Sequence, residues 1–254
     1  MKKRNISPIL KRIAKDLEQA VVDTRKENAM KIYKRKTKFD PKRYFRGDIG
    51  YLGASVGRCK QIGKNYFAQL KKEGFEYKQF MQLAEELLKD NTIESGVIAF
   101  AMVRKLEKQF DWSTFKILER WVNTYVNNWA WCDEISTHLI GVIIDRFPAV
   151  QDDLLEWTRS KNKWVRRAAA VSYVAHGRHG KYHNQIFKTV ERLMEDEDDM
   201  VQKGVGWALK ETSKTDEASV VKFLMKWRTR SARLLLRYAT EKMKPANRKL
   251  ILAS

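Results

Sequence analysis

The chain is poor in the residues that build small secreted folds or membrane spans. It has two cysteines, Cys59 and Cys132, in 254 residues, with no spacing motif around them. This excludes a disulfide framework and a zinc cage, so we expect a reducing, cytoplasmic setting and no metal. The longest apolar run, 97–103, is too short to cross a bilayer. The basic first residues lack a following apolar stretch, so we expect no secretion signal. Because the basic residues are spread along the whole chain rather than gathered beside one apolar helix face, we also expect no membrane partner.

Acidic residues are also in deficit. The sequence holds 31 Asp and Glu against 51 Lys and Arg, a formal net charge of +20. Because each neutralised phosphate releases condensed counterions, such a surplus favours a polyanionic partner, and nucleic acid is the leading candidate. With 43% hydrophobic residues the chain can still bury a sizeable core.

Only four prolines are present, and no alternating runs of strand length occur. Both facts predict a mostly helical protein. Ser7-Pro8 opens one helix, and a second is expected from Thr24 to about residue 36. Later helices are expected to begin at the residues Thr92, Asn128, Asn162, Asp198 or Asp199, and Arg230, and Gly177 reads as a helix stop.

These starts recur about every 32 to 37 residues, the length of a two-helix HEAT-type repeat. The segment 164–167 lines up with 200–203, which places Arg167 and Lys203 at matching positions. We therefore expect an all-α, HEAT-like α-solenoid over 1–254 as one curved domain with a basic concave face. The segment 38–63, rich in glycine and basic residues, is expected to be a long loop.

Four residues stand at matching places in successive repeats. Trp129 and Asp133 lie four apart, on one face of a helix. Arg167 and Trp207 follow in the next two repeats, and stacked repeats line a common surface. Arg166 points about 100° away from Arg167, so only one of the two can face that surface, and the register favours Arg167.

Each of these residues has a structural interpretation as well as a functional one. Trp129 and Trp207 can be core residues. Asp133 can form a salt bridge to Arg167 or cap a helix. It can also be a carboxylate aimed at a developing positive charge between aromatic faces.

Basic and aromatic side chains alternate in the first third of the chain, as a surface that contacts phosphates and bases requires. Their alternative role is a solvated face over core aromatics. We take Tyr33, Lys34, Tyr51 and Arg58 as candidate DNA contacts in this part of the chain. The candidates in the later repeats are Arg166, Arg167 and Lys203.

Two other patterns carry less weight. The stretch Gly53-Ala54-Ser55-Val56-Gly57 fits the G-x-S-x-G nucleophile pattern, but its helical context favours a turn. The cluster of His176, His179 and His183 lacks a cysteine or nearby carboxylate to complete a metal site.

Together these four residues resemble the site residues of the HEAT-like alkylpurine DNA glycosylases of the AlkD type. The four are Trp129, Asp133, Arg167 and Trp207, and the resemblance is clearest from 129 to 241. One departure is Ala130, where the family often has an aspartate. The resemblance implies a catalytic aspartate at Asp133, aromatic contacts at Trp129 and Trp207, and a DNA contact at Arg167.

It also implies an activity: a cofactor-independent, monomeric glycosylase that hydrolyses the bond between deoxyribose and an N3- or N7-alkylated purine in duplex DNA. Such an enzyme would act in base excision repair in the cytoplasm, on the nucleoid. A related subgroup lacks activity, so the alternative is a non-catalytic HEAT-like module that binds nucleic acid. A HEAT-type protein adaptor would leave the charge of +20 unexplained.

Overall fold

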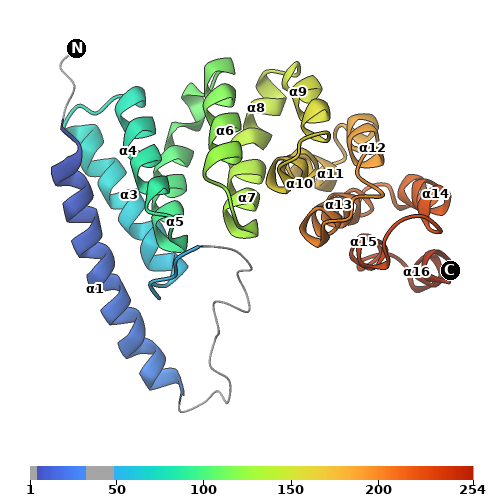
Figure 1. Ribbon diagram of the computed structural model, residues 1–254, viewed down its shortest axis with the longest axis horizontal. Helices are drawn as coiled ribbons and strands as arrows, with labels where there is room; N and C mark the ends of the chain where they lie inside the picture. Colours follow the sequence, from blue (N-terminus) through green and yellow to red (C-terminus); the bar gives the residue numbers. More distant parts are fainter. Residues whose placement is uncertain (1–4, 33–48, 254) are drawn as a thin grey trace. The chain divides into compact units, whose positions relative to one another are not determined.

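The computed structural model describes residues 5–32 and 49–253, and it is helical through nearly all of them (Figure 1). These residues contain no β-strand, and their one strand-like contact is an isolated parallel bridge between Gly50 and Thr92. The predicted all-α, solenoid-like class is therefore confirmed. The chain forms two compact units, Met1–Phe110 and Asp111–Ser254. The single domain over 1–254 and its curved, basic concave face stay predictions.

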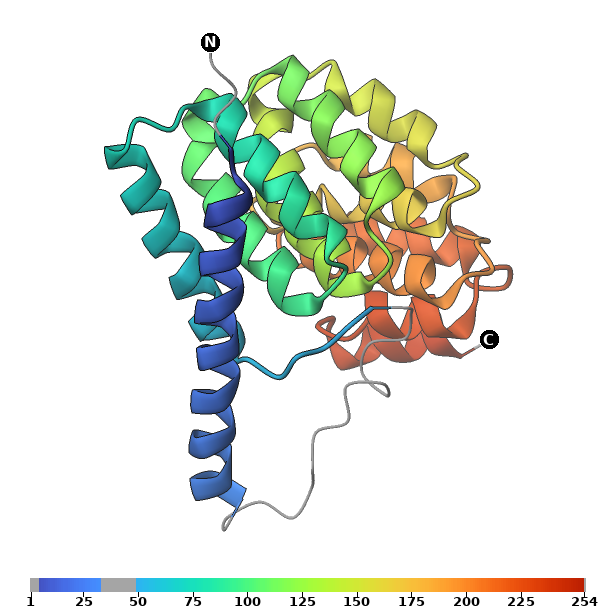
Figure 2. The same cartoon turned by 60° about the vertical axis from the view of Figure 1, so that its left-hand side comes forward.

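The first unit is built around a buried helix. Its helices are α1 (Ser7–Ile32), α3 (Val56–Lys72), α4 (Tyr77–Lys89) and α5 (Ile93–Val103), followed by a 3₁₀ turn, η1 (Arg104–Gln109). Helix α5 is buried on nearly every side and packs against α3 and α4, while α1 lies against α3. Figure 2 shows α1 in blue as a single long helix. No helix in 5–32 or 49–253 is both long and apolar enough to span a membrane.

Helix α1 corrects one prediction. It runs unbroken from Ser7 to Ile32, so no second helix begins at Thr24. The Thr24 hydroxyl instead donates to the carbonyl of Ala20, 2.7 Å away, within the same helix. Threonine makes this bond readily in a helix interior, which is why its capping tendency misled the prediction. Residues 33–36 lie outside the described residues.

The predicted loop at 38–63 is also too long. Helix α3 begins at Val56, and the Ser55 hydroxyl caps it by accepting from the Arg58 amide at 3.3 Å. Gly63 reads as a loop residue but serves packing, because a Cβ there would lie 2.6 Å from the carbonyl oxygen of Ile98 on α5. Of the predicted loop, 38–48 lies outside the described residues and 49–55 is non-helical.

The second unit consists of helix pairs. One layer holds α6 (Trp112–Thr124), α9 (Val150–Trp157), α12 (His183–Glu191) and α14 (Glu217–Trp227) (Figure 1). The other layer begins with α7 (Trp129–Ile135), which continues through a π-helical turn η2 (Ser136–Ile140) into α8 (Gly141–Arg146). It goes on with α10 (Lys163–Val171), α11 (Val174–Arg178), α13 (Asp199–Thr212) and α15 (Arg233–Ala239). Helix α16 (Pro245–Leu252) packs on α14 and α15.

Helices of this second layer begin at 129, 163, 199 and 233, a spacing of 34 to 36 residues. The side chains of Asn128, Asn162 and Asp198 cap three of them, as expected. The last helix begins three residues after the expected Arg230.

Gly177 is not a helix stop. It lies within α11, where a Cβ would come 2.4 Å from the Thr212 hydroxyl oxygen on α13. The chain turns instead at Gly180, which has a φ of +71°. Gly177 is thus a close-packing residue, a role that depends on a helix far along the chain.

Candidate functional site

An ion pair between two neighbouring helices forms the centre of the candidate site. Arg167 on α10 donates from Nε and Nη2 to the two carboxylate oxygens of Asp133 on α7, each at 2.9 Å. Its Nη1 donates to the carbonyl of Met200 at the start of α13. One guanidinium therefore joins three successive helices of the second layer, and such a two-pronged contact fixes the plane of the carboxylate.

Both charges are largely removed from water. The Asp133 side chain is 16% exposed and that of Arg167 is 6% exposed. Burial raises the pKa of Asp133, and the charge and hydrogen bonds of Arg167 oppose this rise. Burial acts to lower the pKa of Arg167, but the Asp133 carboxylate outweighs it, so that pKa is raised. The two-pronged geometry is that of an ion pair, in which each buried group is satisfied by the other.

Gly204 makes room for this arrangement. A Cβ at this position of α13 would lie 3.0 Å from Cγ and 3.3 Å from Nη1 of Arg167. The glycine therefore gives Arg167 room to pass close to the α13 backbone and reach Met200. The sequence shows a glycine in a helix but not this reason for it.

The two helices that carry the predicted aromatic residues flank α10. Trp129 lies on α7 and Trp207 on α13, both half-buried, and α10 packs against both helices. Trp131, two residues from Trp129, is by contrast 1% exposed and belongs to the core. Trp129 thus shares its short helix with Asp133, as the spacing of four predicted.

Tyr238 on α15 is a residue that the sequence did not single out. The residue is 36% exposed, and it lies close enough to Arg167 to contribute to the raised pKa of the guanidinium. It packs over Gly206, where a Cβ would come 2.5 Å from the Tyr238 Cβ. Tyr238 follows Trp207 by 31 residues, which is less than the spacing between repeats. A comparison of matching positions in successive repeats therefore does not identify it.

The other candidate cations of the second unit are engaged in ion pairs. Arg166 donates from Nε to Asp196, 2.6 Å away, and from Nη1 to the carbonyl of Ser160 at 2.9 Å. Lys203 pairs with Asp199 at 2.9 Å, one turn before it. These pairs hold Arg166 and Lys203 against their own and neighbouring repeats, and their assignment as DNA contacts stays a prediction.

Two candidate DNA contacts lie in the described part of the first unit. Arg58 pairs with Asp23 at 3.2 Å and with Glu27, both on α1. Tyr51 is 39% exposed, in the segment before α3. The remaining two, Tyr33 and Lys34, lie outside the described residues.

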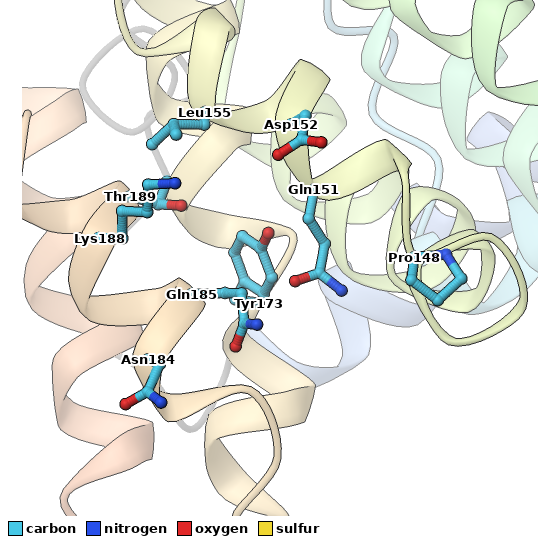
Figure 3. Close-up of a pocket in the computed structure, with 9 residues that line it drawn as sticks. All are labelled: Pro148, Gln151, Asp152, Leu155, Tyr173, Asn184, Gln185, Lys188 and Thr189. Carbon is cyan, nitrogen blue, oxygen red and sulfur yellow. The ribbon is translucent and has the colours of Figure 1, made fainter.

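A separate polar hollow of about 330 Å³ lies between α9 and α12 (Figure 3). Tyr173 reaches it from the end of α10, is 1% exposed, and completes no hydrogen bond with its hydroxyl in the described residues, although Thr189 is close by. None of the candidate site residues lines it. Across 5–32 and 49–253, no three His, Cys, Asp or Glu side chains gather as a metal site would require.

Comparison with known proteins places the chain in a family. The family model described as DNA alkylation repair enzyme matches residues 9–243. A solved structure described as a predicted DNA alkylation repair enzyme from Enterococcus faecalis is similar with a TM-score of 0.68 and 15% identity, over 78% of this chain and 90% of that one.

A second structure, smu.31 from Streptococcus mutans UA159, has a TM-score of 0.54 and 18% identity, over 73% of this chain and all of that one. No curated protein matches. At these identities the solved structures support the fold, while the family model covers almost the whole sequence. The chain belongs to the DNA alkylation repair enzyme family.

Proposed function

We propose that the protein is a DNA glycosylase that releases N3- and N7-alkylated purines from duplex DNA. The observation that carries the proposal is the Asp133 carboxylate, held in a fixed plane by Arg167 on a short helix it shares with the half-buried Trp129. A net charge of +20 and membership of the DNA alkylation repair family supply the substrate class.

The chemistry suits a carboxylate without a strong acid beside it. An alkylated purine is cationic, so when the bond from C1′ to the base nitrogen breaks, the bonding electrons neutralise the base. Positive charge develops on the sugar, and a carboxylate aimed there stabilises the transition state. Water then forms the new bond to C1′ and gives up a proton, which leaves a sugar without a base.

The aromatic residues act on the same charge. The faces of Trp129 and Trp207 carry negative quadrupole potential, which attracts a cationic sugar or base. Tyr238, exposed beside Arg167, adds a third ring to the set.

Arg167 acts mainly through Asp133 in this proposal. Three of the five N–H groups of its guanidinium are used by Asp133 and Met200. Two remain for the phosphate contact that the resemblance assigns to it. We therefore give Arg167 a positioning role first and a phosphate contact second.

The same ion pair also favours a second candidate, a non-catalytic DNA-binding module. A carboxylate bound on both oxygens by arginine can simply tie α7 to α10, since buried pairs of this kind serve structure as well as catalysis. In that case the +20 charge would serve binding alone.

Base release separates the two candidates. Duplex DNA treated with a methylating agent is incubated with the protein, and free 3-methyladenine and 7-methylguanine are measured by chromatography. The proposal predicts release of both or either base in proportion to enzyme. Duplex binding that weakens steeply with salt, without any release of base, would support the binding module instead.

A further inference from the structure

The polar hollow between α9 and α12, which we call the α9–α12 hollow, takes no part in the function proposed above (Figure 3). Its volume of about 330 Å³ lies at the lower end of the range of small-molecule sites, about 300 to 1,000 Å³. Most of its lining side chains are polar, and they include the carboxamides of Gln151, Asn184 and Gln185. An occupant must therefore be polar itself and form several hydrogen bonds.

The hollow keeps an acid and a base apart. Glu156 on α9 and Arg192 at the end of α12 are 36 residues apart and form an ion pair at 3.2 Å. One helical turn earlier on the same two helices, Asp152 and Lys188 are also 36 residues apart, and both line the hollow. Within 5–32 and 49–253 neither side chain forms an ion pair or a hydrogen bond. The helices thus close on each other at one turn and leave two opposite charges unpaired at the turn before it.

Tyr173 adds a polar group on the buried side of the hollow. The residue is 1% exposed, and its hydroxyl completes no hydrogen bond within the part of the chain that the structure describes. Burial raises its pKa, so the hydroxyl keeps its proton and can donate. Figure 3 shows the ring among the lining residues, with the hydroxyl directed toward the space between Asp152 and Thr189. A buried hydroxyl without a partner is costly, and an acceptor on an occupant would remove that cost.

We propose that the α9–α12 hollow binds a small zwitterion of the dipeptide type, with its ammonium group at Asp152 and its carboxylate at Lys188. Hydrogen bonds between charged groups of this kind are among the stronger ones in proteins. Because the two protein charges come from different helices, an occupant that satisfies both needs its own charges at opposite ends. A dipeptide separates its charged ends by a peptide bond, whose N–H and C=O match carboxamides such as those of Gln151 and Gln185.

A nucleotide is the other class of small ligand that carries suitable groups, since Lys188 can bind a phosphate and Asp152 can accept from ribose hydroxyls. Bases, however, gain much of their affinity by stacking on aromatic faces. Tyr173, the aromatic residue of the lining, is 1% exposed and offers no such face. The lining therefore favours the zwitterion, and nucleotide binding is an outcome that the experiment must detect.

The test is isothermal titration calorimetry of the full chain without DNA. The probes are diglycine, glycine, N-acetyldiglycine and adenosine monophosphate. Wild-type protein should bind one diglycine and should bind it more tightly than glycine, whose two charges lie on one carbon atom. N-acetyldiglycine lacks the ammonium group, so it should bind about tenfold more weakly than diglycine.

Two variants remove the protein charges. Asp152→Asn and Lys188→Met should each weaken diglycine binding about tenfold. Asp152→Asn should leave the weak binding of N-acetyldiglycine unchanged, because that probe has no ammonium group to lose. Asp153→Asn is the matched control on α9, since Asp153 lies outside the lining and pairs with Lys116 at 2.8 Å. It should bind diglycine as the wild type does.

Tyr173→Phe tests the hydroxyl. The phenyl ring keeps the packing and removes the unpartnered group, so the unfolding midpoint of the free protein should stay the same or rise while diglycine binding weakens about threefold. A lower midpoint would show that the hydroxyl already has a partner inside the protein. That result, or unchanged binding of diglycine, would remove Tyr173 from the proposal.

The remaining outcomes decide between the occupants. If the wild type does not bind diglycine, or if Asp152→Asn binds it as well as Asp153→Asn does, the zwitterion site is overturned. Binding of adenosine monophosphate without binding of diglycine overturns it in favour of a nucleotide. Because calorimetry needs neither DNA nor base release, this proposal and the glycosylase proposal can fail separately.

Discussion

Removal of Arg167 alone should be one of the most damaging single changes in the second unit. Arg167→Met keeps much of the side-chain volume but leaves the Asp133 carboxylate, 16% exposed, without its partner. Breaking a buried pair in this way costs about 3 to 5 kcal/mol in the free energy of unfolding. The double variant Asp133→Asn with Arg167→Met should recover a large part of that loss, because no unpaired charge then remains.

The assay is urea unfolding followed by circular dichroism, arranged as a double-mutant cycle. Arg159→Met is the matched control, since the pair of Arg159 with Glu156 is 68% and 58% exposed and should be worth about 0 to 1 kcal/mol.

The pH dependence of Arg167→Met has a definite sign. Without Arg167, burial alone acts on Asp133, whose folded-state pKa rises further above its ordinary value of 3.8. The protonated acid needs no partner, so the loss of unfolding free energy in Arg167→Met is smallest below the ordinary pKa of Asp133. The loss grows as the pH rises through the folded-state pKa, because the carboxylate then carries an unpaired charge. A cost equal to that of Arg159→Met, or a deficit that shrinks as the pH rises, would refute the reasoning.

Three further predictions concern the surroundings of the pair. Gly204→Ala should cost about 1 to 3 kcal/mol in urea unfolding, because its methyl group meets Arg167 at 3.0 Å; no change would show that the arginine can shift freely. Tyr238→Ala should lower kcat/KM for base release about tenfold with little loss of stability, and wild-type kinetics would remove Tyr238 from the site. Burial lowers the pKa of His176 despite Asp145, so thermal stability should fall as the pH drops below 6.5, and His176→Gln should flatten that slope.

Local signals in the sequence were sufficient for the start of many helices. Asn128, Asn162 and Asp198 are polar residues whose side chains bond amides only two or three positions ahead, and all three cap helices as predicted. The repeat spacing followed from these caps. The placement of Trp129 and Asp133 on one helix followed from the spacing of four between them.

The predictions that failed concern residues whose role depends on helices far along the chain. Gly63 and Gly177 suggest breaks in a helix, yet each admits a neighbouring helix more than 30 residues away. The sequence could raise the pairing of Asp133 with Arg167 only as one of several roles for the acid. The pairing depends on the packing of α7 against α10, which brings together residues 34 positions apart and which no local pattern reveals.

The charge surplus gave the partner class but not the contacts. Arg58 and Arg166 are candidate DNA contacts, and in the fold each pairs with acids, Arg58 with Asp23 and Glu27 and Arg166 with Asp196. Their contact with DNA stays a prediction. The formal net charge includes these arginines, but it does not indicate which basic side chains form ion pairs with acids in the fold. Only the folded arrangement distinguishes them.

The central claim, that the Asp133 carboxylate acts on the sugar charge, is tested most directly by single-turnover release of 7-methylguanine by Asp133→Asn. Duplex binding is measured in parallel, with Leu250→Ala as a surface control. The account predicts a rate lowered by about 10² to 10³ with duplex affinity nearly unchanged. A variant that folds, binds DNA and releases the base at the wild-type rate would contradict it.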